Sequence, residues 1–138
     1  MVHILIVTHG PLADAFKDST KLFFGDEMAE RIQTIGLFPS NSPEELKDRI
    51  EETIRKIDDG GGVVIFVDMF AGSPFNITAL SIDEMQKDHK LECYTGVNMP
   101  LVMEALAKSS SLTLEELKDA LDKIAEKSIV NLKKALDL

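Results

Sequence analysis

The chain has 138 residues, which is the length of one domain. Hydrophobic residues make up 44% and charged residues 28%, so collagen-like, low-complexity and wholly disordered chains are excluded and a hydrophobic core can form. Fifteen basic residues against 24 acidic ones leave a net charge of −9, which makes nucleic acid and anionic membranes poor partners. We therefore expect residues 1–138 to form a single domain that binds no nucleic acid.

The sequence also indicates a compartment. The apolar run at residues 1–7 is too short for a signal peptide, and no run approaches the ~20 residues that span a bilayer. Cys93 is the only cysteine, so an internal disulfide and a multi-cysteine metal site are excluded, which fits a reducing environment. We expect a cytoplasmic protein.

The first 25 residues predict a strand, a short loop and a helix. The β-branched run Val2–Val7 is typical of a parallel strand that is buried on both faces. Thr8-His9-Gly10 interrupts this run, and Pro11 has the fixed φ that favours a first helical turn. The helix is predicted over Leu12–Phe24 and ends at Gly25.

A second strand–helix unit follows. Arg31–Leu37 predicts a strand, and residues 38–41 predict a loop. Ser42 and Glu45 predict a capping box with Pro43 at the first helical position. The helix behind it has one apolar stripe, formed by Leu46, Ile50, Ile54 and Ile57.

The strand–loop–helix pattern then repeats. The glycines at 60–62 end the second helix, and Val63–Val67 is another β-branched run of the fully buried kind. Asp68 follows this strand directly. After the loop Met69–Ser73, a helix is predicted from Pro74 to about Lys87.

The last third predicts one more strand and two helices. The strand covers Leu91–Thr95, and Asn98 caps a helix that begins near Pro100. Thr113 and Glu116 predict a capping box for the next helix. The tail from Lys127 to Leu138 either continues a helix or forms an edge strand, and its pattern does not choose between them.

Strands that alternate with helices predict an α/β fold with a doubly wound, mainly parallel four-stranded sheet and helices on both faces. In such sheets, ligands bind at the carboxyl ends of the strands where the strand order reverses. If the first and third strands are neighbours, His9 and Asp68 meet at that edge. We expect neither His3, inside the first strand, nor His89, beside Lys90, to take part in chemistry.

A histidine next to an aspartate can act as a nucleophile. The carboxylate fixes the ring tautomer and leaves the other nitrogen with a free lone pair, while helix N-termini nearby provide donors for an anion such as phosphate. Each residue also has a plainer interpretation, because a histidine after a strand is often a loop residue and an aspartate there is often a helix cap.

Three segments carry a resemblance to a known family. They are Val7-Thr8-His9-Gly10, the run Phe66–Asn76 with its Gly-Ser-Pro-Phe-Asn, and Thr95-Gly96-Val97-Asn98-Met99-Pro100-Leu101. With them the chain resembles the enzyme IIA component of the mannose family of the bacterial sugar phosphotransferase system (PTS) over nearly its whole length. Where family members often have a glycine before Gly-Ser-Pro, this chain has Ala71.

The resemblance implies a function and site residues. It implies that His9 accepts a phosphoryl group from the phosphocarrier protein HPr and passes it to a IIB protein, which links the chain indirectly to a membrane IIC/IID permease. It implies that Asp68 orients the ring and that Gly72 and Ser73 hold the phosphoryl oxygens. It also implies a homodimer, in which the tail from Lys127 is an edge strand exchanged between subunits.

The residues themselves fit that role. We expect Nε2 of His9 to be the reacting atom because Asp68 takes the other ring nitrogen, and we expect no metal or nucleotide cofactor because no metal-ligand cluster or P-loop is apparent. Both partners must reach His9, so we expect a shallow apolar rim around it. The candidates are Phe70, Phe75, Met99 and Leu101, and the competing interpretation of these four residues is core packing.

Two other functions stay open at this point. One is the phosphoryl-donor subunit of a dihydroxyacetone kinase, which uses the same kind of domain. The other is a non-enzymatic flavodoxin-like or receiver-like binding module. A receiver needs further acidic residues after the first strand to hold Mg²⁺, and the chain has Thr8-His9-Gly10 there.

Overall fold

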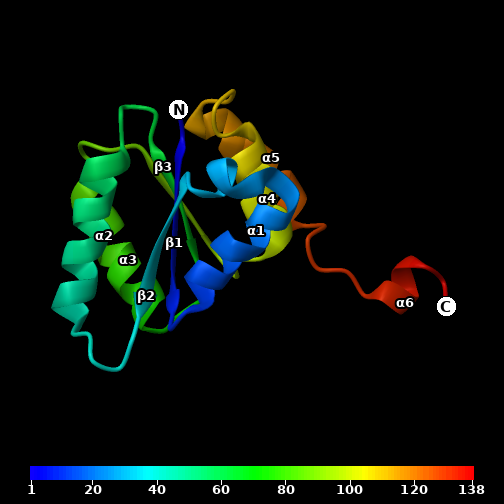
Figure 1. Cartoon of the computed structure of the whole chain (residues 1–138), viewed down its shortest axis with the longest axis horizontal. Coiled ribbons are helices and arrows are strands. Elements are labelled where there is room, and N and C mark those ends of the chain that lie inside the picture. The colour runs from blue at the N-terminus through cyan, green and yellow to red at the C-terminus, as the bar shows by residue number, and fades with distance from the viewer.

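The computed structural model describes residues 1–138 and has four strands and six helices (Figure 1). The strands are β1 (His3–His9), β2 (Ile32–Leu37), β3 (Val63–Val67) and β4 (Leu91–Thr95). The helices are α1 (Leu12–Ala29), α2 (Pro43–Ile57), α3 (Ser73–Met85), α4 (Met99–Lys108), α5 (Leu114–Ala125) and α6 (Leu132–Ala135). All four predicted strands and the five predicted helices are confirmed, with small shifts at several ends.

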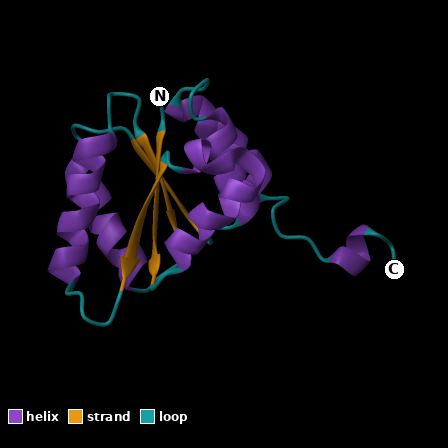
Figure 2. Cartoon of the chain, in the orientation of Figure 1, coloured by secondary structure: helices purple, strands orange, loops and turns teal.

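The four strands form one parallel sheet in the order β2-β1-β3-β4. From β1 the chain moves outward to β2, then crosses back to β3 on the other side of β1 and continues to β4. The strand order therefore reverses between β1 and β3, as the predicted doubly wound fold requires. In Figure 2 the strands lie between two groups of helices.

Each face of the sheet has its own core. Side chains alternate between the two faces of β1, so Ile4 and Ile6 belong to one core and Leu5 and Val7 to the other. The first core packs against α1, α4 and α5, and the second packs against α2 and α3. Burial on both faces explains why β1 and β3 are nearly continuous apolar runs.

Two helix ends differ from the prediction. Gly25 leaves helical geometry as predicted (φ 79°), but one further turn follows it and carries α1 on to Ala29. At α2 only half of the predicted capping box forms: Ser42 Oγ accepts from Glu45 N at 3.1 Å, while the Glu45 carboxylate accepts from Asn41 instead. At α5 the box of Thr113 and Glu116 is complete.

The tail leaves the body of the molecule (Figure 1). Ser128 anchors its start through a 3.1 Å hydrogen bond that Oγ accepts from Asn98 Nδ2. Beyond it the residues are exposed and pair with no strand of the chain, and α6 is a single turn. A strand exchanged with a second copy stays a prediction. None of the helices is long and apolar enough to span a membrane.

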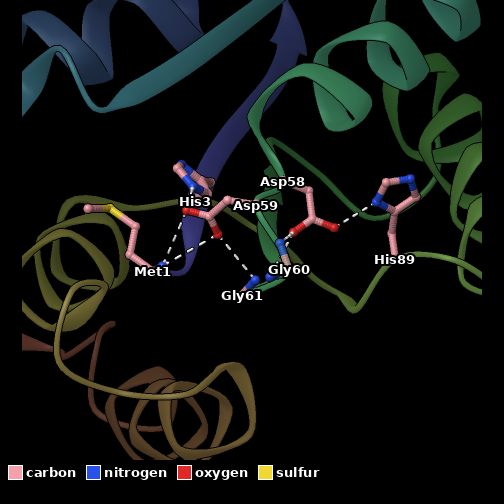
Figure 3. Close-up of polar contacts among 8 residues, drawn as sticks. Met1, His3, Asp58, Asp59, Gly60, Gly61 and His89 are labelled. Carbon is pink, nitrogen blue, oxygen red and sulfur yellow. Dashed lines mark hydrogen bonds and ion pairs between the residues drawn. The ribbon is translucent and has the colours of Figure 1, made fainter.

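Polar contacts tie together the amino edge of the sheet, where the strands begin (Figure 3). Asp59 accepts from the amino terminus at 3.4 Å and lies 3.1 Å from Nε2 of His3. Its neighbour Asp58 lies 2.6 Å from Nδ1 of His89. The two aspartates thus join α2 to the start of β1 and to the segment between α3 and β4.

Candidate functional site

His9 and Asp68 meet at the carboxyl edge of the sheet. His9 is the last residue of β1, Asp68 comes directly after β3, and the two strands pair through Val7 and Val67. Asp68 Oδ2 lies 2.7 Å from Nδ1 of His9 and also accepts from the His9 backbone N–H at 2.9 Å. The predicted pairing is confirmed, and one carboxylate oxygen fixes both the ring and the backbone of His9.

Asp68 is held in its charged form. Its side chain is only 11% exposed, and this burial by itself raises the pKa. The hydrogen bonds from the amide and ring of His9 outweigh burial, so the pKa of Asp68 lies below its ordinary value. A carboxylate that stays ionised keeps the proton of His9 on Nδ1 and leaves a lone pair on Nε2.

The other side of the ring is open. The His9 side chain is 48% exposed, and Gly72 lies beside it: a Cβ on Gly72 would stand 3.5 Å from Cε1 and 3.8 Å from Nε2. Gly72 has φ 101° and Ala71 before it has φ 62°, so the loop turns sharply back toward His9. The positive φ is therefore kept at Ala71, a position where most residues other than glycine avoid it.

Gly72 is also the N-cap of α3. The first helical amides have no acceptor four residues earlier, so the N–H groups of Ser73 and Phe75 remain without an intrahelical partner, and Pro74 has no N–H. Ser73 is exposed at the same place. Free N–H groups and the positive end of a helix dipole can bind an anion, and the start of α3 lies beside the His9 ring.

The four predicted rim residues separate into two groups. Phe70 is 74% exposed and packs against the half-buried Phe75, with ring centroids 4.8 Å apart. Met99 is half-buried and lines a small groove between α1 and α4. Leu101 is only 3% exposed and belongs to the core, so its inclusion in the rim was wrong and core packing is the correct interpretation.

One part of this edge was missed. A hollow of about 440 Å³ adjoins His9 on the side of β2 and is lined by His9, Gly10, Leu37, Phe38, Pro39 and Asn41. The signal was present, because the loop after β2 must also lie at the carboxyl edge of a parallel sheet. This loop was not predicted to belong to the site because its residues carry no charged or reactive side chain.

No group of three or more histidine, cysteine, aspartate or glutamate side chains is placed to hold a metal ion.

Comparison with known proteins decides the family. The family described as "PTS system fructose IIA component" matches residues 3–122. The chain belongs to this family. A IIA protein is a phosphotransferase component that carries a phosphoryl group within a sugar PTS. The dihydroxyacetone kinase role is not favoured, because the named relatives are sugar-specific.

Two curated relatives illustrate the family. The fructose-specific EIIA component of Bacillus subtilis is 27% identical over 128 residues, which cover 93% of this chain and 84% of the relative. The mannose-specific EIIAB component of Escherichia coli is 30% identical over 117 residues, which cover 84% of this chain. The match spans 35% of that longer protein, so it concerns a part of it.

Solved structures confirm the fold. The EIIA component from Streptococcus agalactiae superposes with a TM-score of 0.84 at 24% identity, covering 97% of this chain and 99% of that one. The mannose/sorbose IIA subunit from Enterococcus faecalis has a TM-score of 0.79 at 17% identity, covering 94% and 92%. The α/β architecture of the IIA chain is thus that of other IIA proteins.

Proposed function

We propose that His9 carries the phosphoryl group on Nε2, receives it from HPr and passes it to a IIB protein. The observation that carries this proposal is that the two ring nitrogens of His9 have different surroundings. Nδ1 is hydrogen-bonded to Asp68 at 2.7 Å, while the Nε2 side is open beside Gly72 at the N-terminus of α3. A histidine held in this way has only Nε2 available to accept a phosphoryl group.

The transfer step needs no further reagent. The Nε2 lone pair of neutral His9 attacks phosphorus in line, an Nε2–P bond forms, and the P–N bond of phospho-HPr breaks with its electron pair returning to the donor nitrogen. The proton stays on Nδ1, and the Asp68 carboxylate balances the positive charge that develops on the ring. Transfer to IIB is the same step in the opposite sense.

The edge of α3 supplies the charge stabilisation. The N–H groups of Ser73 and Phe75 and the Ser73 hydroxyl can donate to the equatorial oxygens of the phosphoryl group. Gly72 leaves room for that group, because any side chain there would face Nε2. Asp68 lies on the Nδ1 side of the ring, so its negative charge is kept away from the incoming phosphate.

Both partners use one surface in turn. We place it around the exposed side of His9, with Phe70 and Phe75 on one side, Phe38 on the other, and Met99 at its margin. The exposed tail from Lys127 supports a homodimer in which this segment is covered by a second copy. The proposal places the chain in the cytoplasm, with the IIC/IID permease as the indirect end point.

The test is phosphorylation in a reconstituted chain of phosphoenolpyruvate, enzyme I and HPr, with intact mass as the readout. We expect the unmodified chain to gain one phosphoryl group that is lost in acid and kept in alkali, and His9→Ala to gain none. His89→Ala is the matched control, because His89 also binds an aspartate through Nδ1, and we expect it to be labelled normally.

Two results would contradict the proposal. One is the absence of any label on the unmodified chain, and the other is undiminished labelling of His9→Ala. The ring atom is tested separately by NMR of the phosphorylated chain, where an Nδ1 phosphoramidate would show that Asp68 does not set the orientation as described.

A further inference from the structure

Gly36 lies against the turn that follows His9. It pairs with Thr8 between β2 and β1, and the next residue, Leu37, pairs with His9 and accepts from Gly10 N at 2.7 Å. A Cβ on Gly36 would stand 2.3 Å from the Gly10 carbonyl oxygen and 2.9 Å from Cε2 of Phe38. Gly10 and Phe38 therefore meet in the space that a side chain at Gly36 would occupy.

Space, and not backbone conformation, demands glycine at this position. Gly36 does not have positive φ, so alanine could adopt its backbone geometry without strain. The contact with Gly10 is to a backbone oxygen, which cannot rotate away as the end of a side chain can. Relief of the clash requires a shift between β2 and the turn after His9.

We propose that Gly36 is a positioning residue for His9, a claim that rests on the proposed function. By admitting the Gly10 carbonyl, Gly36 holds the end of β1 where a single Asp68 oxygen reaches both the amide and Nδ1 of His9. Gly36 touches neither the ring nor the phosphoryl group, so it acts only through the backbone of Gly10 and His9.

The matched control is Gly61, which lies at the amino edge of the sheet, where the strands begin. A Cβ on Gly61 would stand 2.1 Å from the Met1 carbonyl oxygen, and Gly61 also lacks positive φ. Gly61→Ala therefore creates a similar clash with a backbone oxygen, far from His9. A difference between the two variants reports on the position of the clash and not on its severity.

The experiment measures His9 directly. The rate of phosphorylation is taken with phospho-HPr and with phosphoramidate, a small donor that needs no docking, and ¹⁵N NMR follows the Nδ1 proton of His9. Since a displacement of about 1 Å can cost about 10²-fold, we expect Gly36→Ala to slow both reactions about 10- to 100-fold and to weaken the Nδ1 signal. Gly61→Ala should stay within about two-fold of the unmodified chain in both reactions.

Phe38→Ala provides a second test if Gly36→Ala does not fold, because it removes the side chain beside Gly36 without creating a clash. We expect it to slow the phosphoramidate reaction about three-fold. Rates within two-fold and an unchanged Nδ1 signal in Gly36→Ala, or in Phe38→Ala if Gly36→Ala does not fold, would overturn the proposal, as would equal loss in Gly36→Ala and Gly61→Ala. If phospho-HPr does not label the unmodified chain, the proposed function fails, while the NMR signal still tests the positioning.

Discussion

The two edges of the sheet both carry a histidine bound to an aspartate. At the carboxyl edge His9 Nδ1 lies 2.7 Å from Asp68, and at the amino edge His89 Nδ1 lies 2.6 Å from Asp58 (Figure 3). Both aspartates are largely buried, and the hydrogen bonds they accept bring the pKa of each below its ordinary value against the opposing effect of burial. The two pairs therefore share the same contact between a ring Nδ1 and a buried carboxylate.

The two edges differ in whether the backbone N–H groups near the histidine are already hydrogen-bonded. At the amino edge Asp58 accepts from the amides of Gly60 and Gly62, so the donors near His89 are already used. At the carboxyl edge α3 begins beside His9, and its first amides, those of Ser73 and Phe75, have no intrahelical partner. His9 is also 48% exposed against 20% for His89. We therefore expect a histidine–aspartate pair to support phosphoryl transfer only where free donors and access accompany it, as the proposed role of His9 requires.

The largest contrast is expected from the aspartates. In Asp68→Asn the amide no longer fixes the ring tautomer or balances its charge, so the rate of transfer from phospho-HPr should fall about 10²- to 10⁴-fold. Asp58→Asn should leave this rate within about two-fold and lower the free energy of unfolding by about 1–3 kcal/mol instead. Rapid-quench phosphorylation and urea unfolding of both variants measure the two effects. Similar losses of the phosphoryl-transfer rate in Asp68→Asn and Asp58→Asn would show that the two edges do not differ in function.

A second contrast uses two glycines with the same positive φ, a backbone conformation that would strain an alanine. Gly72 and Gly60 both have φ 101°, but a Cβ on Gly72 meets the His9 ring and one on Gly60 meets nothing within 4 Å. We expect Gly72→Ala to slow phosphorylation about 10- to 100-fold because its methyl group stands where the phosphoryl group must enter. Gly60→Ala should only be less stable, by about 1–2 kcal/mol. Equal phosphorylation rates would show that Gly72 is needed for its conformation alone.

A smaller effect is expected at the rim. Phe70→Ala should lower kcat/KM for phosphoryl transfer from HPr about 5- to 30-fold, as for the loss of an exposed aromatic anchor, and should leave the phosphoramidate reaction unchanged. Phe23, which is also exposed and lies near the end of α1, is the matched control and should have no effect on either reaction. An unchanged rate with HPr in Phe70→Ala would remove this residue from the docking surface.

The sequence predicts the carboxyl edge better than its surroundings. The β-branched runs, Gly25 and the capping residues locate the elements because those signals are local, and the order of a doubly wound sheet then brings His9 to Asp68. Leu101 could not be assigned from its type, since the same leucine suits a rim or a core until α4 is packed. The hollow at Phe38 and the lack of room for a side chain at Gly36 depend on how β2 lies against β1, and no local pattern records this contact.

The smallest effect concerns acid and the amino edge. The nearby ring of His3 and a hydrogen bond from Gly61, together with the charge of the amino terminus, lower the pKa of Asp59 from 3.8 to about 2. A carboxyl whose pKa is lower in the folded chain stabilises the fold above its unfolded pKa and loses this contribution as the pH falls through the folded value. The contribution of Asp59 should therefore be lost between about pH 4 and pH 2, and Asp59→Asn should flatten the fall in urea midpoint over this range. Because Asp59 is exposed, the change should be small, and phosphorylation of His9 at neutral pH should not respond to it. A midpoint curve that is identical in the two chains would show that the amino edge is held by Asp58 and His89 alone.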